Sequence, residues 1–597
     1  MKNKEKEQGS FRIIWFFFAK RKLRVAWLLI LSLLAGGLEA ITVVAIYPIL
    51  NAAFEEGFAG ESVVLTVFRG LANLLPVADE FISYCLLFIF SAVFTFVAKY
   101  ISINYRVRFG TDLVERNQNE IFRKFIRADY QFFTDHRQGE LIYNVATAPQ
   151  RLSGLINSAT ELLAQVILSV SVIFILFSLS WQGTLVVILM AVIYQSVSRY
   201  FAKKISYYSA MGERDAVRES NVILNEAISG IRQIKVFGVA EDWINRFNTT
   251  MKKRWYHFIR RFVWSQMPSP ALMLVLYFFI GITAISIRIL VPTDFIELIP
   301  IFGTFTFAVF RLASIMGGIS GLTMGIMGAL PDCETVYNTL GENLTHIRDG
   351  EKEFDSFKSE IQFDNVTFSY KGREKLLEDV SFTFEKGKTT AIVGRSGSGK
   401  TTIINLLLRL FEIDKGKVKV DGLDVREYKL ASWLNKIGVV SQDTFAFNDT
   451  IRNNITFHLN YADDEVIRVA RYADAHSFIT ELPDDYDTFV GDTGVRLSGG
   501  QRQRIAVARA MIREPEILIF DEATNALDNI SEAAVQQAID QIAKDHTIII
   551  IAHRLSTVVN ADKIIVLGDG QVLEEGTHEE LMKHRGAYWE LYQKEAV

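Results

Sequence analysis

The sequence predicts a two-part chain in which an all-α domain of six transmembrane helices precedes a mixed α/β domain. Of the 597 residues, 50% are hydrophobic and 22% are charged, a composition too apolar for an ordinary water-soluble protein. The apolar residues are crowded before residue 335, whereas short β-branched runs separated by turns begin at Ile361. We therefore expect a membrane domain over residues 25–335, a linker over 336–360 and an α/β domain over 361–597.

The membrane domain is predicted from runs of about 20 apolar residues, the length that a helix needs to cross ~30 Å of hydrocarbon. The six runs are Val25–Ile49, Phe81–Ile103, Leu162–Leu179, Thr184–Tyr200, Phe262–Ile287 and Phe295–Met327. Residues 1–24 precede the first run and contain the aromatic and aliphatic segment Phe11–Ala19, which is followed by basic residues. Such a segment suits the headgroup layer, so we expect an interfacial elbow helix there.

Lysine and arginine residues in the connections predict how the spans are oriented, because cytoplasmic connections carry an excess of them. The connections 104–160 and 201–261 are rich in both, whereas residues 51–80 hold five acidic residues against Arg69 alone. We therefore expect a multi-pass protein of the cell inner (cytoplasmic) membrane, with both long connections and the α/β domain in the cytoplasm. Apolar residues at helical spacing in these connections predict spans that continue tens of Å beyond the bilayer as paired helices.

Three ionisable residues fall at membrane depth, namely Glu39, Lys99 and Arg311. A charge at the bilayer centre costs ~2.5–3.5 kcal/mol on insertion scales, so such residues usually face a bundle interior or a water-filled cavity. Glu39 and Arg311 are the candidate cavity charges, either as an internal ion pair that fixes helix packing or as contacts to a substrate. Lys99 lies near the cytoplasmic end of its span and is expected to extend its ammonium group toward the interface.

The α/β domain contains a phosphate-binding motif in a strand–loop–helix setting. Thr389–Val393 is predicted as a buried strand and Ile403–Leu410 as a helix, and the sequence between them fits G-x-x-x-x-G-K-[ST]. Glycines let backbone N–H groups approach phosphate oxygens, Lys400 reaches the β/γ-phosphates, and the Thr401 hydroxyl coordinates Mg²⁺. The predicted ATP-binding loop is Gly394, Arg395, Ser396, Gly397, Ser398, Gly399, Lys400, Thr401 and Thr402.

A second predicted strand, Ile517–Phe520, ends in two neighbouring acidic residues, Asp521 and Glu522. Neighbouring residues that leave a strand diverge, so one carboxylate can hold the Mg²⁺ shell while the other faces an attacking water molecule. We assign Asp521 to the metal and Glu522 to the water.

The segment Leu497, Ser498, Gly499, Gly500 and Gln501 precedes a predicted helix over Ile505–Ile512. By itself it is a serine-capped helix start that could offer its hydroxyl and amides to an anion. Together with the phosphate loop and Asp521-Glu522, in this order, LSGGQ resembles the ATP-binding cassette (ABC) family over about residues 361–596. The six spans with long cytoplasmic extensions are similar to the exporter-type half-transporters of that family, so the resemblance covers nearly the whole chain.

The resemblance implies roles for four more residues. Tyr370 resembles the aromatic residue that stacks on adenine, and Gln442 resembles the glutamine that senses Mg²⁺ and water. Asp528 resembles the aspartate that communicates between the two sites of a dimer, and His553 resembles the switch histidine that contacts the γ-phosphate and orients the water. The implied catalytic residues are Glu522 and His553, and the implied Mg²⁺ ligands are Thr401, Gln442 and Asp521.

Weaker similarities concern the membrane half. Glu39, Pro48 and the string Phe310-Arg311-Leu312 are similar to the exporter branch that includes lipid-linked oligosaccharide flippases, although Ser314 stands where that branch has proline. Residues 132–141 resemble the approach to the first coupling helix of exporters, which is therefore expected near Tyr143–Leu152. The second coupling helix is expected near Ser209–Asn221 or slightly downstream of it.

The family model implies an ABC-type transport ATPase that converts ATP and water to ADP and phosphate. LSGGQ of a second half-transporter would close over ATP held by the first, so the chain is expected to pair, as a homodimer or with a degenerate partner. The expected activity is alternating-access export or flipping of a lipid, glycolipid or other hydrophobic or amphipathic substrate.

Several alternatives to lipid export remain open on the sequence. They are a multidrug or peptide exporter, a membrane-anchored regulatory ATPase and an ATP-gated channel. The long cytoplasmic extensions disfavour a regulatory ATPase, and Glu522 together with His553 disfavours a channel. The formal net charge of −4 gives no reason to expect a nucleic acid as a partner.

Overall fold

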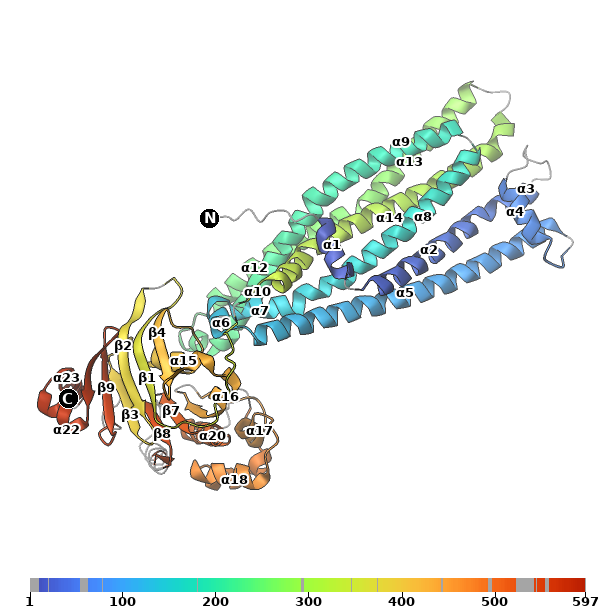
Figure 1. Cartoon of the computed structure of the whole chain (residues 1–597). Helices are drawn as coiled ribbons and strands as arrows, with labels where there is room; N and C mark the ends of the chain where they lie inside the picture. Colours follow the sequence, from blue (N-terminus) through green and yellow to red (C-terminus); the bar gives the residue numbers. More distant parts are fainter. Residues whose placement is uncertain are drawn as a thin grey trace. The chain divides into compact units, whose positions relative to one another are not determined.

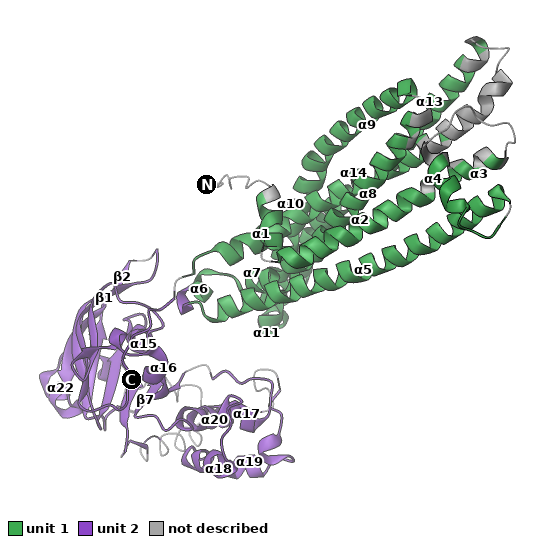
Figure 2. Ribbon diagram, turned by 45° about the vertical axis from the view of Figure 1, so that its right-hand side comes forward, with its two compact units in different colours: residues 1–128, 132–344 green, residues 129–131, 345–597 purple. Residues whose placement is uncertain are grey.

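The computed structural model describes most of the chain, and its helices and strands are labelled in Figure 1. The described residues are 10–19, 21–53, 63–77, 79–179, 181–290, 295–344, 346–372, 374–441, 444–491, 497–521, 539, 542–543, 545–552 and 558–595. They form two compact units, coloured separately in Figure 2. Unit 1 comprises Met1–Ala128 and Phe132–Leu344, and unit 2 comprises Asp129–Gln131 and Thr345–Val597.

Unit 1 is all-α, as predicted. Its α-helices are α1 Ser10–Ala19, α2 Lys22–Val44, α3 Ile46–Ala53, α4 Val63–Ala72, α5 Glu80–Ile126, α7 Gln138–Ile142, α8 Arg151–Leu179, α9 Trp181–Phe201, α10 Tyr208–Ser229, α11 Ile231–Val236, α12 Ala240–Gln266, α13 Pro268–Leu290 and α14 Phe295–Gly341, and α6 Tyr130–Asp135 lies where the two units meet in sequence. Within the described residues, six helices are long and apolar enough to cross a membrane. The six-span prediction is therefore confirmed.

The spans extend far beyond the apolar runs. Helices α5 and α14 each contain 47 residues, about 70 Å at 1.5 Å per residue, which is more than twice the hydrocarbon thickness. Helix α14 also continues to Gly341, past residue 335, where we expected the membrane domain to end.

Two short helices lie where the chain turns back from one long helical extension to the next. Helix α6 lies between α5 and α7, and α11 lies between the paired helices α10 and α12. The prediction of a first coupling helix near Tyr143–Leu152 is wrong, because that segment continues into α8 and buries both end residues in the core of unit 1. Sequence spacing alone did not reveal that the reversal comes earlier, at α6.

Two π-helical segments contact the same stretch of α14 with tyrosine hydroxyls. They are η1, Tyr143–Thr147, and η3, Ala202–Tyr207. The Tyr143 hydroxyl donates to Asp332, and the Tyr207 hydroxyl lies 2.9 Å from Glu334 Oε2. Since π-helical turns are rare and usually mark special positions, these contacts identify residues 332–334 as a point where the extensions of the third and fourth spans are both fastened to α14.

Unit 2 contains two sheets. An antiparallel sheet has the order β2-β1-β4-β5, and a six-stranded sheet has the order β10-β9-β3-β8-β7-β6. The strands are β1 Glu360–Ser369, β2 Lys375–Glu385, β3 Thr389–Gly394, β4 Lys415–Val420, β5 Leu423–Asp424, β6 Ile437–Val440, β7 Ile517–Asp521, β8 Thr547–Ile551, β9 Lys563–Gly568 and β10 Gln571–Gly576. Apart from β10, which pairs antiparallel with β9, the second sheet is parallel. The predicted α/β class is confirmed.

Unit 2 also contains α-helices. They are α15 Lys400–Leu407, α16 Leu430–Asn435, α17 Ile451–Thr456, α18 Asp463–Tyr472, α19 His476–Thr480, α20 Gly499–Met511, α22 His578–His584 and α23 Ala587–Glu595. The central strands β7 and β8 are almost continuous isoleucine, leucine and phenylalanine, which is typical of parallel strands that are buried on both faces.

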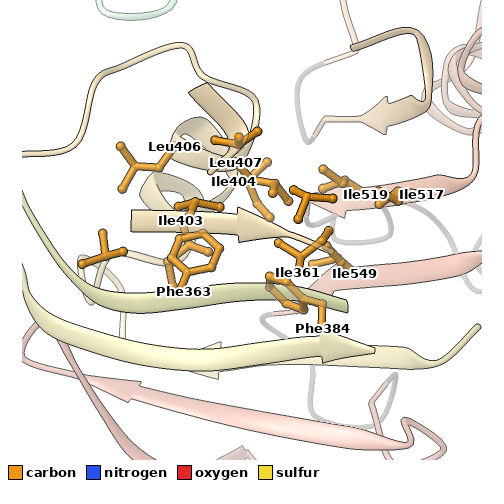
Figure 3. Packing of buried hydrophobic residues seen from close by; sticks show 14 of the residues in the cluster. Ile361, Phe363, Phe384, Ile403, Ile404, Leu406, Leu407, Ile517, Ile519 and Ile549 are labelled. Atoms are coloured by element: carbon orange, nitrogen blue, oxygen red, sulfur yellow. The ribbon is translucent and has the colours of Figure 1, made fainter. Parts of the chain in front are cut away.

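One buried cluster holds the two sheets and α15 together (Figure 3). Ile361, Phe363 and Phe384 come from the antiparallel sheet, Ile517, Ile519 and Ile549 from the parallel sheet, and Ile403, Ile404, Leu406 and Leu407 from α15. Full burial of each such side chain contributes about 1.5–3 kcal/mol. The core therefore fixes α15, and with it the loop that precedes this helix.

Candidate functional site

The loop between β3 and α15 has the backbone geometry of a phosphate cradle. Gly394 has φ 153° and Gly399 has φ 101°, values that residues with a side chain rarely adopt. A Cβ atom at Gly394 would lie 2.2 Å from the Leu567 carbonyl oxygen, and one at Gly399 would lie 2.6 Å from the Leu377 side chain. Both glycines are therefore required for the loop to turn close to its neighbours.

Polar groups of this loop are held in place for an anion. The Lys400 ammonium donates to the carbonyl oxygens of Gly394 at 2.9 Å and Arg395 at 3.0 Å. The buried Ser398 hydroxyl has no hydrogen-bond partner in the described part of the chain, and an unsatisfied buried hydroxyl is costly. Because α15 begins at Lys400, the free N–H groups of its first turn point to the same place.

Tyr370 lies beside the start of α15. Its hydroxyl is 3.1 Å from the Thr402 hydroxyl, and its ring packs edge-on against Phe411 with a centroid distance of 5.1 Å. The structure therefore brings Tyr370 and the phosphate loop together, although they are far apart in the sequence.

The oxygen donors of this region suit Mg²⁺. The Thr401 hydroxyl is exposed at the first turn of α15, and Asp521 ends β7, which β8 separates from β3. Hard oxygen ligands fit Mg²⁺, which commonly takes only one or two protein ligands and completes its shell with phosphate oxygens and water. The described residues contain no cluster of three or more His, Cys, Asp or Glu side chains, and such a cluster is not needed for this kind of site.

Several predicted site residues lie outside the described residues, namely Gln442, Glu522, Asp528 and His553. The strands that precede Gln442, Glu522 and His553 in the sequence all end at one sheet edge. Val440 ends β6, Asp521 ends β7 and Ile551 ends β8, and these neighbouring strands are parallel. Their carboxyl ends therefore meet at the edge where the phosphate loop follows β3.

The LSGGQ segment forms the start of α20. The Gln501 backbone N–H donates to the Ser498 hydroxyl at 3.2 Å, and the Gln501 side chain accepts from the Ser498 N–H at 2.8 Å. The Ser498 cap was expected from the sequence, and the structure adds the reciprocal bond to the Gln501 side chain. This cap lies at the start of α20, whereas the phosphate loop lies between β3 and α15.

Sequence reasoning missed a half-buried arginine of α20, Arg509, which binds residues of the segment that follows Gln442. Arg509 donates to the carbonyl oxygens of Phe445 and Asn454, each at 2.7 Å, and to the Asn454 side-chain oxygen at 3.0 Å. The Asn454 amide in turn donates to the Phe447 carbonyl at 2.9 Å. Burial lowers the pKa of Arg509 to about 10, which leaves it charged at neutral pH. No local pattern distinguishes Arg509 from the other arginines of α20.

We expect Arg509→Met to destabilise the ATPase unit by about 3 kcal/mol, because it leaves two oxygen acceptors of the buried Asn454 without their donor. At this domain size the apparent melting temperature of the full chain should fall by about 6–12 °C. Arg513→Met is the matched control, since Arg513 is exposed just beyond α20 and exposed substitutions usually change stability by less than about 0.5 kcal/mol. Equal melting temperatures for the two variants would contradict the structural role of Arg509.

The predicted cavity charges of the membrane half are found together. Glu39 Oε1 lies 2.9 Å from the Arg311 guanidinium, and Glu39 Oε2 lies 2.9 Å from Lys99 Nζ. The side chain of Glu39 is 17% exposed, against 35% for Arg311 and 43% for Lys99. The prediction that Lys99 extends toward the interface is therefore wrong. Its charge is held by Glu39 across the α2–α5 contact, a pairing that the sequence of one helix does not reveal.

A second ion pair involves a residue of α5 that lies about two helical turns beyond Lys99. Arg106 is 2.7 Å from Glu161 on α8, and the Gln165 amide donates to the same carboxylate at 3.3 Å. Lys99 and Arg106 are seven residues apart, so they project from the same side of α5. Glu39 with its two cations and Glu161 with Arg106 together place three cations against two carboxylates within the helix bundle.

Comparison with known proteins agrees with this architecture. Residues 25–309 match the family model described as the ABC transporter transmembrane region, and residues 377–525 match the one described as ABC transporter. The chain is 31% identical to the ATP-dependent lipid A-core flippase of Sodalis glossinidius, over 98% of this chain and 97% of that protein. It is 36% identical to the heterocyst differentiation ATP-binding protein HepA of Nostoc sp., over 81% of this chain and 79% of that one.

A solved structure has the same fold over nearly the whole length. A bacterial Atm1-family ABC exporter with ATP bound has a TM-score of 0.77 and 25% sequence identity, covering 96% of this chain and 98% of that one. The described spans and the α/β unit account for both family matches. The chain therefore belongs to the ATP-binding cassette (ABC) transporter family, as an exporter-type transport ATPase of the membrane with its ATP-binding domain in the cytoplasm.

Proposed function

We propose that this chain uses ATP to flip a lipid, a glycolipid or a similar amphipathic molecule across the cytoplasmic membrane. The observation that carries the proposal is the match over 98% of the chain to a protein named as a lipid A-core flippase. The ion cluster of Glu39, Lys99 and Arg311 inside an apolar helix bundle supports it, because an amphipath presents both a polar head and an apolar tail. Neither relative points to a drug or a peptide as cargo.

The proposed ATP site uses the residues around the carboxyl edge of the parallel sheet. Backbone N–H groups of residues 394–402 and the Lys400 ammonium bind the phosphates, and the Tyr370 ring binds adenine. Thr401, Gln442 and Asp521 would hold Mg²⁺, which would neutralise charge on the phosphate oxygens. Glu522 accepts the proton of the attacking water, and His553 orients that water at the γ-phosphate.

The active form is proposed to be a dimer, because the chain matches one transmembrane region and one ATP-binding domain, and half-transporters of this family typically pair. LSGGQ of one copy then completes the site of the other. A homodimer is favoured since one chain carries every residue of the site, and a heterodimer with a degenerate partner is the second candidate. Helices α6 and α11, at the reversals of the long extensions, are the proposed coupling helices.

Closure of the ATPase domains drives transport only if the cargo binds the inward and outward states with different affinity. The three cations and two carboxylates of the bundle are the groups proposed to sense the polar head. These groups come from four helices, and their ion pairs link α2 to α5, α2 to α14, and α5 to α8.

The experiment is a flipping assay with the purified full chain in proteoliposomes. Fluorescently tailed amphipaths are compared: an anionic glycolipid, a zwitterionic phospholipid and a cationic drug. ATP should move at least one of the two lipids, and a non-hydrolysable ATP analogue in the same vesicles should move none. Translocation of the drug alone would overturn lipid flipping while leaving the transport ATPase in place.

A further inference from the structure

Helix α4 lies in the connection between the first two spans, on the side opposite the long cytoplasmic connections. Figure 1 shows α3 and α4 together at the end of the bundle where α2 ends and α5 begins. One side of α4 is buried in unit 1. Phe68 and Ala72 pack there against Ala45 and Tyr84, so α4 is a fixed part of the fold.

A second side of α4 is apolar and uncovered. Val67 is 55% exposed, Leu71 is 43% exposed and Leu74, in the turn after the helix, is 79% exposed. Their spacing of four and then three residues places them on one stripe. Leaving such side chains in water forgoes about 1.5–3 kcal/mol for each one that could be fully buried.

The neighbouring surface of α5 indicates which environment this stripe faces. Helix α5 begins at Glu80, and its first turns expose Phe81 and Ile82, followed by Ile89 and Phe90. These residues belong to the second membrane span, so their exposed side faces acyl chains. Helix α4 packs on the start of the same helix, and it therefore sits at the depth where that span enters the headgroup layer.

Polar groups flank the stripe, as interfacial helices require. Arg69 pairs with Glu80 at 3.6 Å, and Asn73 and Asp79 are exposed. The connection as a whole is acidic, which disfavours attraction to anionic headgroups. We propose that Val67, Leu71 and Leu74 form a docking surface for the outer leaflet of the membrane, bound by apolar contact. This surface is additional to the proposed flipping pathway and does not depend on the cargo.

The test is site-directed spin labelling of the full chain in lipid nanodiscs. Val67→Cys, Leu71→Cys and Leu74→Cys are compared with Asn73→Cys, each with Cys85→Ser and Cys333→Ala to remove the native thiols. Oxygen collects in lipid, whereas a nickel chelate stays in water. At each position the measured quantity is the ratio of oxygen accessibility to nickel-chelate accessibility. This ratio should be at least threefold higher at the three stripe positions than at position 73.

Two other results would overturn the proposal. Nickel accessibility at positions 71 and 74 equal to that at position 73 would place the stripe in water. Low accessibility to both reagents would show that protein covers it, either a second copy of the chain or another part of this one. Unchanged ATP turnover in the labelled variants shows that they are folded, so each pattern is decisive.

Discussion

Replacing Glu522 with glutamine is expected to lower ATP turnover by at least about 100-fold while leaving ATP binding intact. A positioned general base commonly contributes 10²–10⁴-fold, and an amide cannot accept the proton of water although it has the same shape. Position 522 follows Asp521 in the sequence, and Asp521 ends β7 at the sheet edge that carries the phosphate loop. The measurement is steady-state hydrolysis by the chain in nanodiscs, beside equilibrium binding of a fluorescent ATP analogue.

Glu579→Gln is the matched control for Glu522→Gln, because Glu579 is an exposed residue of α22, a helix that contributes none of the proposed ATP-site residues. It should hydrolyse ATP within twofold of the wild type. Hydrolysis by Glu522→Gln at the wild-type rate would mean that another group, with His553 the first candidate, accepts the proton. A wild-type chain that binds ATP but hydrolyses none would instead contradict the homodimer and require a partner subunit.

The sequence was sufficient for features that are local in the chain. The phosphate loop could be predicted because one strand, one loop and one helix contain the whole motif, and the glycines that it needs are at the required positions, as Gly394 and Gly399 show. The Ser498 cap was predicted for the same reason, since it bonds to a residue three positions away. The six spans followed from length and hydropathy alone.

Features that depend on packing between distant elements could not be predicted. Lys99 reaches Glu39 because α5 lies against α2, and Arg509 reaches Asn454 because α20 lies against α17. Neither hydropathy nor spacing within one helix encodes such a neighbour. The first reversal was misplaced for a related reason, because the sequence of residues 143–152 does not show that η1 continues into α8.

Replacing Glu39 with glutamine is expected to destabilise the membrane half and to lower its coupling to ATP turnover. It removes the one carboxylate that both Arg311 and Lys99 contact at 2.9 Å. Breaking a buried pair from one side costs 3–5 kcal/mol, and the partial exposure of the two cations reduces this cost to about 3 kcal/mol. The apparent melting temperature of the chain in nanodiscs should fall, and lipid-stimulated ATP turnover should fall with it.

The double variant Glu39→Gln/Arg311→Gln separates packing from cargo recognition. It removes one charge of each sign, so less unpaired charge remains in the bundle, and thermal stability should recover most of the loss seen in Glu39→Gln. If these charges only hold α2 against α14, lipid-stimulated turnover should recover as well. If Arg311 also contacts the polar head of the cargo, turnover should stay low in the recovered protein. A double variant no more stable than Glu39→Gln would contradict the ion pair itself.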